Sequence, residues 1–280
     1  MTTRYISTPF SFKLTSLIAG TLLAVFLVLS GCDSITDFDK INENPNDPTQ
    51  VSSTQQLSGL LANFAYQVAG NEAVRIPALW IQQASQNTDP PNEDSYQYTE
   101  VDPNNLWEFW LYSGALPDAQ NIQEAARSEE NFGTVGIGQV MEAWGWMITA
   151  DLFGDIPVEE AFRQDITNPA YSDQEVAYDS VFVLLERARQ NLAQGNAAPL
   201  GGSDLLYGGD LGKWTSLAWA LEAKAHIHLT ESGYSAGLDG ASDRQARAQA
   251  ALDAALNAFP NGNADNPSFI FPGEIGRAHV

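Results

Sequence analysis

The chain has few cysteines, basic residues and histidines, and these shortages exclude several classes of function. Its 280 residues include one cysteine, three histidines, and 13 Lys and Arg against 35 Asp and Glu. A single cysteine cannot form a disulfide within the chain. Nucleic acids and anionic lipid surfaces are bound through clustered Lys and Arg, so a net charge of −22 makes both poor partners.

Long apolar runs are also scarce, and the most prominent one covers residues 14–29 (LTSLIAGTLLAVFLVL). Its length of about 16 residues is below the ~20 that a helix needs to cross a bilayer. Arg4 and Lys13 precede it without any acidic residue, and two small residues follow it. This order is typical of a secretory signal, so residues 1–31 are predicted to be a signal peptide. Its removal leaves a net charge of about −24.

The only cysteine stands directly after this segment. Leu29-Ser30-Gly31-Cys32 resembles the lipobox that lipoprotein signal peptidase recognises, in which small residues admit the backbone and the thiol accepts a diacylglycerol. Cys32 is therefore predicted to be acylated and to hold the protein at a membrane by lipid. A noncleaved anchor or a chance cysteine is the alternative. Residues 32–54 are rich in Asn, Asp and Pro, which predicts an extended tether.

From residue 55 onward, apolar residues recur at helical spacing and alternating β patterns of useful length are absent, so the fold is predicted to be mainly α. Ser172-Asp-Gln-Glu175 is predicted to cap a helix as a capping box. Alanines at 246, 250, 254 and 258 predict a ridge that a neighbouring helix approaches closely. The predicted helices are Leu57–Gly70, Ile76–Gln86, Leu106–Ser128 (with Pro117 kinking or dividing it), Ile137–Leu152, Ser172–Gly195, Trp214–Leu229 and Ser242–Ala258.

Several carboxylates follow the helix that is predicted to stop at Gly154. Asp151, Asp155, Glu159 and Glu160 raise the hypothesis of a glycoside hydrolase, which needs two carboxyls ~5–9 Å apart across a cleft. Proximity in the sequence does not establish that geometry. The favoured interpretation is that Asp151 and Asp155 bind backbone amides in the turn and cap the next element.

The sequence predicts neither a metal site nor a cofactor site. His226 and His228 are two residues apart on a helix and point in different directions, so they cannot share a metal. Asn261-x-Asn263-x-Asp265 resembles the start of a calcium loop but lacks the glycine and the glutamate that such a loop needs later. It is interpreted as a turn.

Aromatic side chains supply the candidate ligand-binding residues. Tyr96 and Tyr98 lie in a polar loop rich in Asn, Asp and Pro, which leads directly to Trp107 and Trp110. Flat rings beside hydrogen-bonding side chains suit the docking of a sugar or a peptide. At helical spacing, however, tryptophans such as these two are more often part of the core. An aromatic platform for a neutral or weakly charged polymer is predicted from these four residues.

An ordered set of motifs resembles the SusD/RagB family of nutrient-binding outer-membrane lipoproteins, and it extends over most of the mature chain. The most recognisable motif is ADLFGDIPVEEA at residues 150–161. The others are Ser30-Gly31-Cys32-Asp33, INENPNDPT at 41–49, PAYSDQE at 169–175 and YGGDLGKW at 207–214.

The resemblance implies a tetratricopeptide-like scaffold of helical pairs with long irregular loops. It also implies a surface-exposed lipoprotein that captures oligosaccharide or peptide and delivers it to a SusC-like, TonB-dependent outer-membrane transporter. Asp33, directly after the cysteine, resembles a surface-export signal. The family has no catalytic motif to carry over, so the chain is expected not to be an enzyme. A surface-anchored glycoside hydrolase is the alternative.

The length of the chain also departs from the family, whose members are about twice as long. Residues 274–280 (EIGRAHV) look like the translation of a sequencing adapter. Residues 55–273 are therefore predicted to be the N-terminal part of a SusD-like domain that is truncated at its C-terminal side, and 274–280 to be a non-native tail.

Overall fold

The computed structural model describes residues 51–87, 93–238 and 244–260. Within these ranges β pairing is limited to one antiparallel bridge, between Ile156 and Ser172. The mainly α prediction is confirmed. The helices are α3 (Ser53–Asn63), η1 (Phe64–Val68), α4 (Glu72–Trp80), η2 (Asn105–Ala115), α5 (Leu116–Ser128), α6 (Phe132–Phe153), α7 (Gln174–Leu192), η3 (Gly201–Ser203), α8 (Leu211–His228) and α9 (Arg244–Ala258).

Several sequence predictions fall outside these ranges. The signal peptide, Cys32, most of the tether, the Asn261–Asp265 turn and the tail at 274–280 are not among the described residues. Among those that are described, no helix is both long enough and apolar enough to cross a bilayer.

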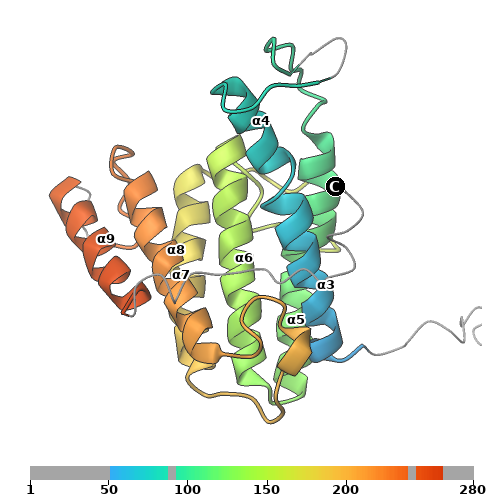
Figure 1. The fold of residues 1–280 in the computed structure, drawn as a ribbon, viewed down its shortest axis with the longest axis vertical. Helices are drawn as coiled ribbons and strands as arrows, with labels where there is room; N and C mark the ends of the chain where they lie inside the picture. Colours follow the sequence, from blue (N-terminus) through green and yellow to red (C-terminus); the bar gives the residue numbers. More distant parts are fainter. Residues whose placement is uncertain (1–50, 88–92, 239–243, 261–280) are drawn as a thin grey trace, which may run out of the picture. The chain divides into compact units, whose positions relative to one another are not determined.

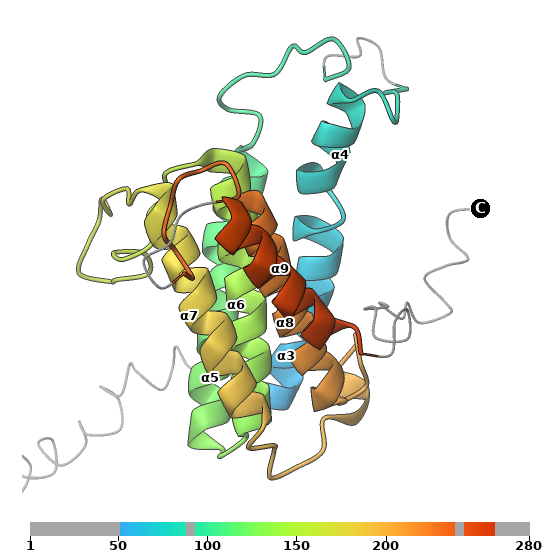
Figure 2. The same ribbon diagram turned by 90° about the vertical axis from the view of Figure 1, so that its left-hand side faces the viewer.

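The long helices pack in chain order, each against the next: α5 on α6, α6 on α7, α7 on α8 and α8 on α9 (Figure 1). The connection between α5 and α6 is short (residues 129–131), which makes these two an antiparallel pair, whereas the later helices are joined by longer segments at 154–173, 193–210 and 229–243. Turning the view by a quarter shows α9 lying along α8, while α4 extends beyond the ends of the other helices (Figure 2). This end of the bundle carries the candidate site.

Helix α6 lies at the centre of the core, and 16 of its 22 residues are buried. Its glycines let the two neighbouring helices approach its backbone. A Cβ atom on Gly136 would lie 2.9 Å from the carbonyl oxygen of Ala188 in α7. A Cβ on Gly138 would lie 3.1 Å from the carbonyl oxygen of Ala119 in α5. Because α6 is apolar on every side, it fits a helix that is enclosed by others.

Pro117 and Gly154 mark helix boundaries, as the sequence predicted. The helical stretch 106–128 divides into η2 and α5, with Pro117 in the first turn of α5, where a missing N–H is tolerated. Helix α6 ends at Gly154, whose φ of 76° is a left-handed conformation that glycine adopts without steric strain.

Several predictions of local structure were wrong. The helix predicted at Ile76–Gln86 is α4, which covers Glu72–Trp80 and has Pro77 in its interior. Ser172 does not cap α7 through a capping box: its backbone pairs with Ile156, and Asp173 occupies the N-cap position without a side-chain bond. The buried stripe of α9 is also shifted, because Arg247 and Ala251 are buried together with Ala254 and Ala258. The Arg247 side chain donates to the carbonyl oxygens of Tyr234 (2.7 Å) and Ala236, so it holds the preceding loop and needs the inner face.

Candidate functional site: two adjacent aromatic cavities

The motif ADLFGDIPVEEA links three helices, and Asp151 is the linking residue. Its carboxylate accepts a hydrogen bond from the Tyr178 hydroxyl of α7, and His228 Nδ1 of α8 lies 2.9 Å from its Oδ2. The expectation that Asp151 binds backbone amides in the turn was wrong, because it faces α7 and α8. Burial, together with the bond to Asp151, raises the pKa of Tyr178 and keeps its hydroxyl a donor.

The other carboxylates of this motif bind backbone. Asp155 Oδ1 accepts from the Gln174 amide at 3.0 Å, so it caps α7 from a distance, as predicted for the next element. Glu160 Oε2 accepts from the Ala170 amide at 2.7 Å. These bonds fix the segment between α6 and α7, and with it the position of Tyr171 next to the end of α6.

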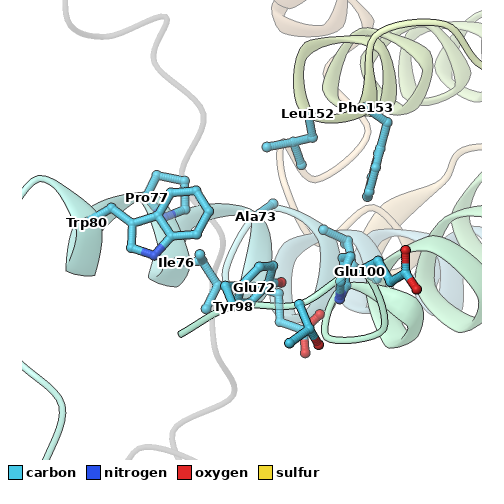
Figure 3. Close-up of a pocket in the computed structure, with 12 residues that line it drawn as sticks. Glu72, Ala73, Ile76, Pro77, Trp80, Tyr98, Glu100, Leu152 and Phe153 are labelled. Carbon is cyan, nitrogen blue, oxygen red and sulfur yellow. The ribbon is translucent and has the colours of Figure 1, made fainter. Parts of the chain in front are cut away.

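The first cavity, here called the α4 cavity, has a volume of about 320 Å³. Its walls come from one face of α4, from the chain at 98–106 and from the end of α6. Figure 3 shows Trp80 and Glu100 at opposite ends of the labelled side chains, with Tyr98 and Glu72 between them and Leu152 projecting from α6. The rings of Trp80 and Tyr98 meet edge to face, with centroids 5.4 Å apart. Such a cavity offers apolar and aromatic surface with few polar groups.

The second cavity, here called the Trp107 cavity, has a volume of about 350 Å³ and shares Glu100, Pro103 and Phe153 with the first. The Trp107 ring packs edge-on against Phe153, and it lies nearly parallel to the ring of Tyr171, at an interplanar angle of 11°. Tyr171 is 66% exposed, so much of its surface is open to a ligand. The two cavities together form one aromatic surface over the end of α6.

Gln86 and residues 93–96, close to the α4 cavity, are held by polar contacts. The Gln86 side chain donates a hydrogen bond to the Glu93 carboxylate and accepts one from the Glu93 backbone amide. The backbone amide of Gln86 donates to the Asp94 carboxylate. Arg75 of α4 forms an ion pair with Glu93, which raises the pKa of Arg75. The Tyr96 hydroxyl donates to the Trp80 carbonyl at 2.7 Å. These contacts attach residues 93–96 to α4, two residues before Tyr98, whose ring packs against Trp80.

The structure brings together some of the residues predicted from sequence. Tyr98 lines the α4 cavity and Trp107 lines the second one. Tyr96 lies beside Trp80 at the rim, and its φ of 59° is unusual for a bulky residue. Trp110 is half-buried against the core and lines neither cavity.

Sequence reasoning missed three aromatic residues of the two cavities. Trp80 was visible upstream of the loop but was not included in the platform. The sequence around Phe153 and Tyr171 did not indicate a binding role. Phe153 has the spacing of a core residue, and Tyr171 lies in the segment after the end of α6.

The charged residues that line the two cavities are acidic. Among the described residues, the lining of the cavities includes Glu72, Glu100 and Asp155 and contains no Lys, Arg or His. Burial raises the pKa of the Tyr98 phenol, and the neighbouring charge of Glu72 adds to the effect. No group of three potential metal-ligating side chains occurs among the described residues.

Comparisons with known proteins agree with this architecture of paired helices. Residues 45–277 match the SusD-like family model, described as "Starch-binding associating with outer membrane". Because the match covers most of the chain, this chain belongs to the SusD-like family. A comparison with curated protein sequences finds no match.

Solved structures show the same fold. A SusD/RagB family protein from Bacteroides thetaiotaomicron is 24% identical, with a TM-score of 0.71, over 80% of this chain and 46% of that one. A SusD-like protein from the same species is 17% identical, with a TM-score of 0.59 over 77% and 44% of the two chains. A chitin-binding SusD homolog from Flavobacterium johnsoniae is 17% identical, with a TM-score of 0.56 over 77% and 46%. The chain spans less than half the length of these structures.

Proposed function

We propose that this protein is a lipid-anchored, surface-exposed nutrient-binding protein of the outer membrane. In this proposal it captures an oligosaccharide on the two aromatic cavities and passes it to a SusC-like, TonB-dependent transporter. The observation that carries the proposal is the aromatic surface formed by Trp80, Tyr98, Trp107 and Tyr171 at one end of a SusD-like scaffold. Family membership and the chitin-binding homolog favour a glycan over a peptide.

Sugar recognition needs the chemistry that these cavities offer. A pyranose ring presents an apolar face of C–H groups, which stacks on an aromatic ring, and a rim of hydroxyls that hydrogen-bond to carboxylates and amides. Trp107 and Tyr171 supply ring faces, while Asn104 and Asp155 of the same cavity supply polar partners. The contacts of Gln86 and of residues 93–96 reduce the ordering cost of binding.

Substitution of single rings tests this assignment. We expect Tyr98→Ala and Tyr171→Ala each to weaken binding of chitin or starch oligosaccharides by about 1–3 kcal/mol, roughly 5- to 150-fold, through lost stacking. Calorimetric titration measures the affinity, and a thermal melt of each variant shows whether the fold is retained.

Tyr66→Ala is the matched control. Tyr66 is 67% exposed on η1 and lines neither cavity, so its removal should leave the affinity unchanged. Equal binding by wild type, Tyr98→Ala and Tyr171→Ala in stably folded protein would reject the aromatic site.

The hydrolase alternative finds little support in the candidate carboxylates. Asp151 is paired with His228, and Asp155 and Glu160 each accept a hydrogen bond from a backbone amide. Such partners fit structural roles better than catalytic ones. Incubation with the same oligosaccharides and chromatography of the products tests this directly: intact oligosaccharide is expected, and shortened products would favour a hydrolase.

A further inference from the structure

We infer that the hydroxyl group of Tyr112 is a positioning group for ligand binding: it holds the 154–173 segment against η2 and so keeps the ring of Tyr171 parallel to that of Trp107. The inference rests on the proposed function and adds a residue that lines neither cavity. Tyr112 acts on the ligand only through the two rings that border the Trp107 cavity.

The first observation is that these two rings belong to different parts of the chain. Trp107 lies in η2, whereas Tyr171 lies near the end of the segment that connects α6 to α7. Their rings are nearly parallel, with centroids 6.2 Å apart. Because Tyr171 is 66% exposed, packing around its own side chain contributes little to this arrangement. The arrangement therefore depends on how the backbone of the segment is attached to η2.

The second observation is the attachment itself. The Tyr112 hydroxyl, from the same helix as Trp107, donates a 2.9 Å hydrogen bond to the carbonyl oxygen of Pro157. Among the described residues, no other hydrogen bond joins η2 to the 154–173 segment. Pro157 is buried, so water cannot easily replace the hydroxyl as the donor to this carbonyl.

A β-bridge continues the connection from Pro157 to Tyr171. Ile156, next to Pro157, exchanges backbone hydrogen bonds of 3.1 and 2.9 Å with Ser172. Ser172 directly follows Tyr171 in the chain. The Tyr112 hydroxyl is thus connected to the backbone of Tyr171 through two neighbouring bonded pairs.

The third observation is the packing of the Tyr112 ring between η2 and the segment. Its centroid lies 4.6 Å from that of Trp107 and 5.9 Å from that of Phe162. Phe162 has a φ of 63°, a left-handed conformation that is strained for a bulky residue and persists only where the surroundings hold it. Burial raises the pKa of Tyr112, so its hydroxyl stays protonated and remains a donor near neutral pH.

Tyr112→Phe tests the role of the hydroxyl, because it removes the donor and keeps the ring. N-acetylglucosamine hexamer and maltohexaose are titrated into the whole chain by calorimetry, and thermal melts check the fold. The variant should bind about two- to tenfold more weakly than wild type, because Tyr171 must then be ordered on binding. An affinity equal to that of wild type would overturn the inference.

A double variant shows whether the effect passes through Tyr171. In the Tyr171→Ala background, Tyr112→Phe should change the affinity by less than about 1.5-fold, because the ring that it positions is already absent. An equal loss of affinity in both backgrounds would mean that the hydroxyl acts by another route, and the inference would be wrong.

Tyr178→Phe is the matched control. It also removes a tyrosine hydroxyl that bonds a distant residue, Asp151, but its ring lies in the core and lines neither cavity. Its affinity should equal that of wild type even if its melting temperature falls. If it weakens binding as much as Tyr112→Phe does, general loosening of the helices explains both results and the inference is rejected.

Tryptic cleavage at Arg163 gives a second reading that needs no ligand. Arg163 is exposed within the 154–173 segment, and cleavage of a native chain requires local opening. Cleavage there, identified by mass spectrometry, should be about two- to tenfold faster in Tyr112→Phe and unchanged in Tyr178→Phe. An unchanged rate in Tyr112→Phe would show that the hydroxyl does not hold the segment.

Failure of the inference is distinguishable from failure of the proposed function. If Tyr171→Ala weakens binding but Tyr112→Phe does not, only the inference fails. If the wild-type chain binds neither oligosaccharide, both fail.

Discussion

At the scale of single residues, the buried pair of His226 and Arg247 determines the protonation state of the histidine. His226 is 3% exposed and stacks near Phe182, and its Nδ1 lies 3.2 Å from Nη1 of the buried Arg247. A guanidinium can only donate, so Nδ1 must be an acceptor and the ring must be neutral. Burial, and then the charge of Arg247, lowers the pKa of His226 to about 4.

This pair predicts a pH dependence of stability. Between about pH 6.5 and 4 the unfolded chain protonates His226 while the native state does not, so acidification favours unfolding in that window. The free energy of unfolding should fall by up to about 3 kcal/mol on that account, with no contribution from this group above pH 6.5. Denaturant titrations at several pH values measure it.

A variant separates His226 from the other titrating groups. Glutamine keeps an acceptor for Arg247 but does not titrate, so His226→Gln should have a flatter stability profile than wild type between pH 6.5 and 4. Profiles of identical slope would contradict the assignment.

At the scale of secondary-structure elements, the contacts of α6 depend on glycine. The Cβ of Gly136→Ala would meet both the backbone and the side chain of α7, with Leu192 Cγ only 2.6 Å away. Separating the helices to relieve this contact should destabilise the protein by about 1–3 kcal/mol. Chemical denaturation of the variant measures the change.

Gly59→Ala in α3 is the control with the opposite sign. Nothing lies within 4 Å of a Cβ at Gly59, and the residue is exposed in a helix. Alanine should therefore stabilise the protein by about 0.5–1 kcal/mol. If both substitutions shift stability alike, close packing of α6 on α7 is not the cause.

At the scale of the whole molecule, the proposed function requires an anchor and a partner. Cys32→Ser removes the only thiol that could accept a lipid. We expect the variant to incorporate no labelled palmitate and to remain unprocessed or to be released from the membrane. Wild-type levels of label in the variant would rule out Cys32 as the anchor.

The transporter partner is tested on the full-length protein. We expect a large outer-membrane β-barrel to co-purify with it in mild detergent, because the proposed function couples ligand capture to uptake. A pull-down that repeatedly yields no barrel, from cells that express the lipoprotein normally, would argue against delivery to a transporter. Ligand binding in the isolated chain would be unaffected by that result.

The sequence by itself determined most of the long helices of this protein, but not α4, which covers Glu72–Trp80 instead of the predicted Ile76–Gln86. Apolar spacing located α5 to α8, Pro117 divided one helical stretch and Gly154 ended another, because these signals depend on neighbours within a few residues along the chain. The ordered motifs were enough to indicate the family. Tyr98 and Trp107 were also singled out from sequence as candidate ligand-binding residues, on local composition.

Only the tertiary structure decided what these elements place side by side. Asp151 binds side chains of α7 and α8, and Asp155 replaces Ser172 as the cap of α7. Tyr171 reaches Trp107 across the end of α6, whereas Trp110 packs against the core. Helical periodicity specifies which face of a helix is apolar but not which helix covers it. Contacts between distant segments, and the cavities they enclose, follow from packing.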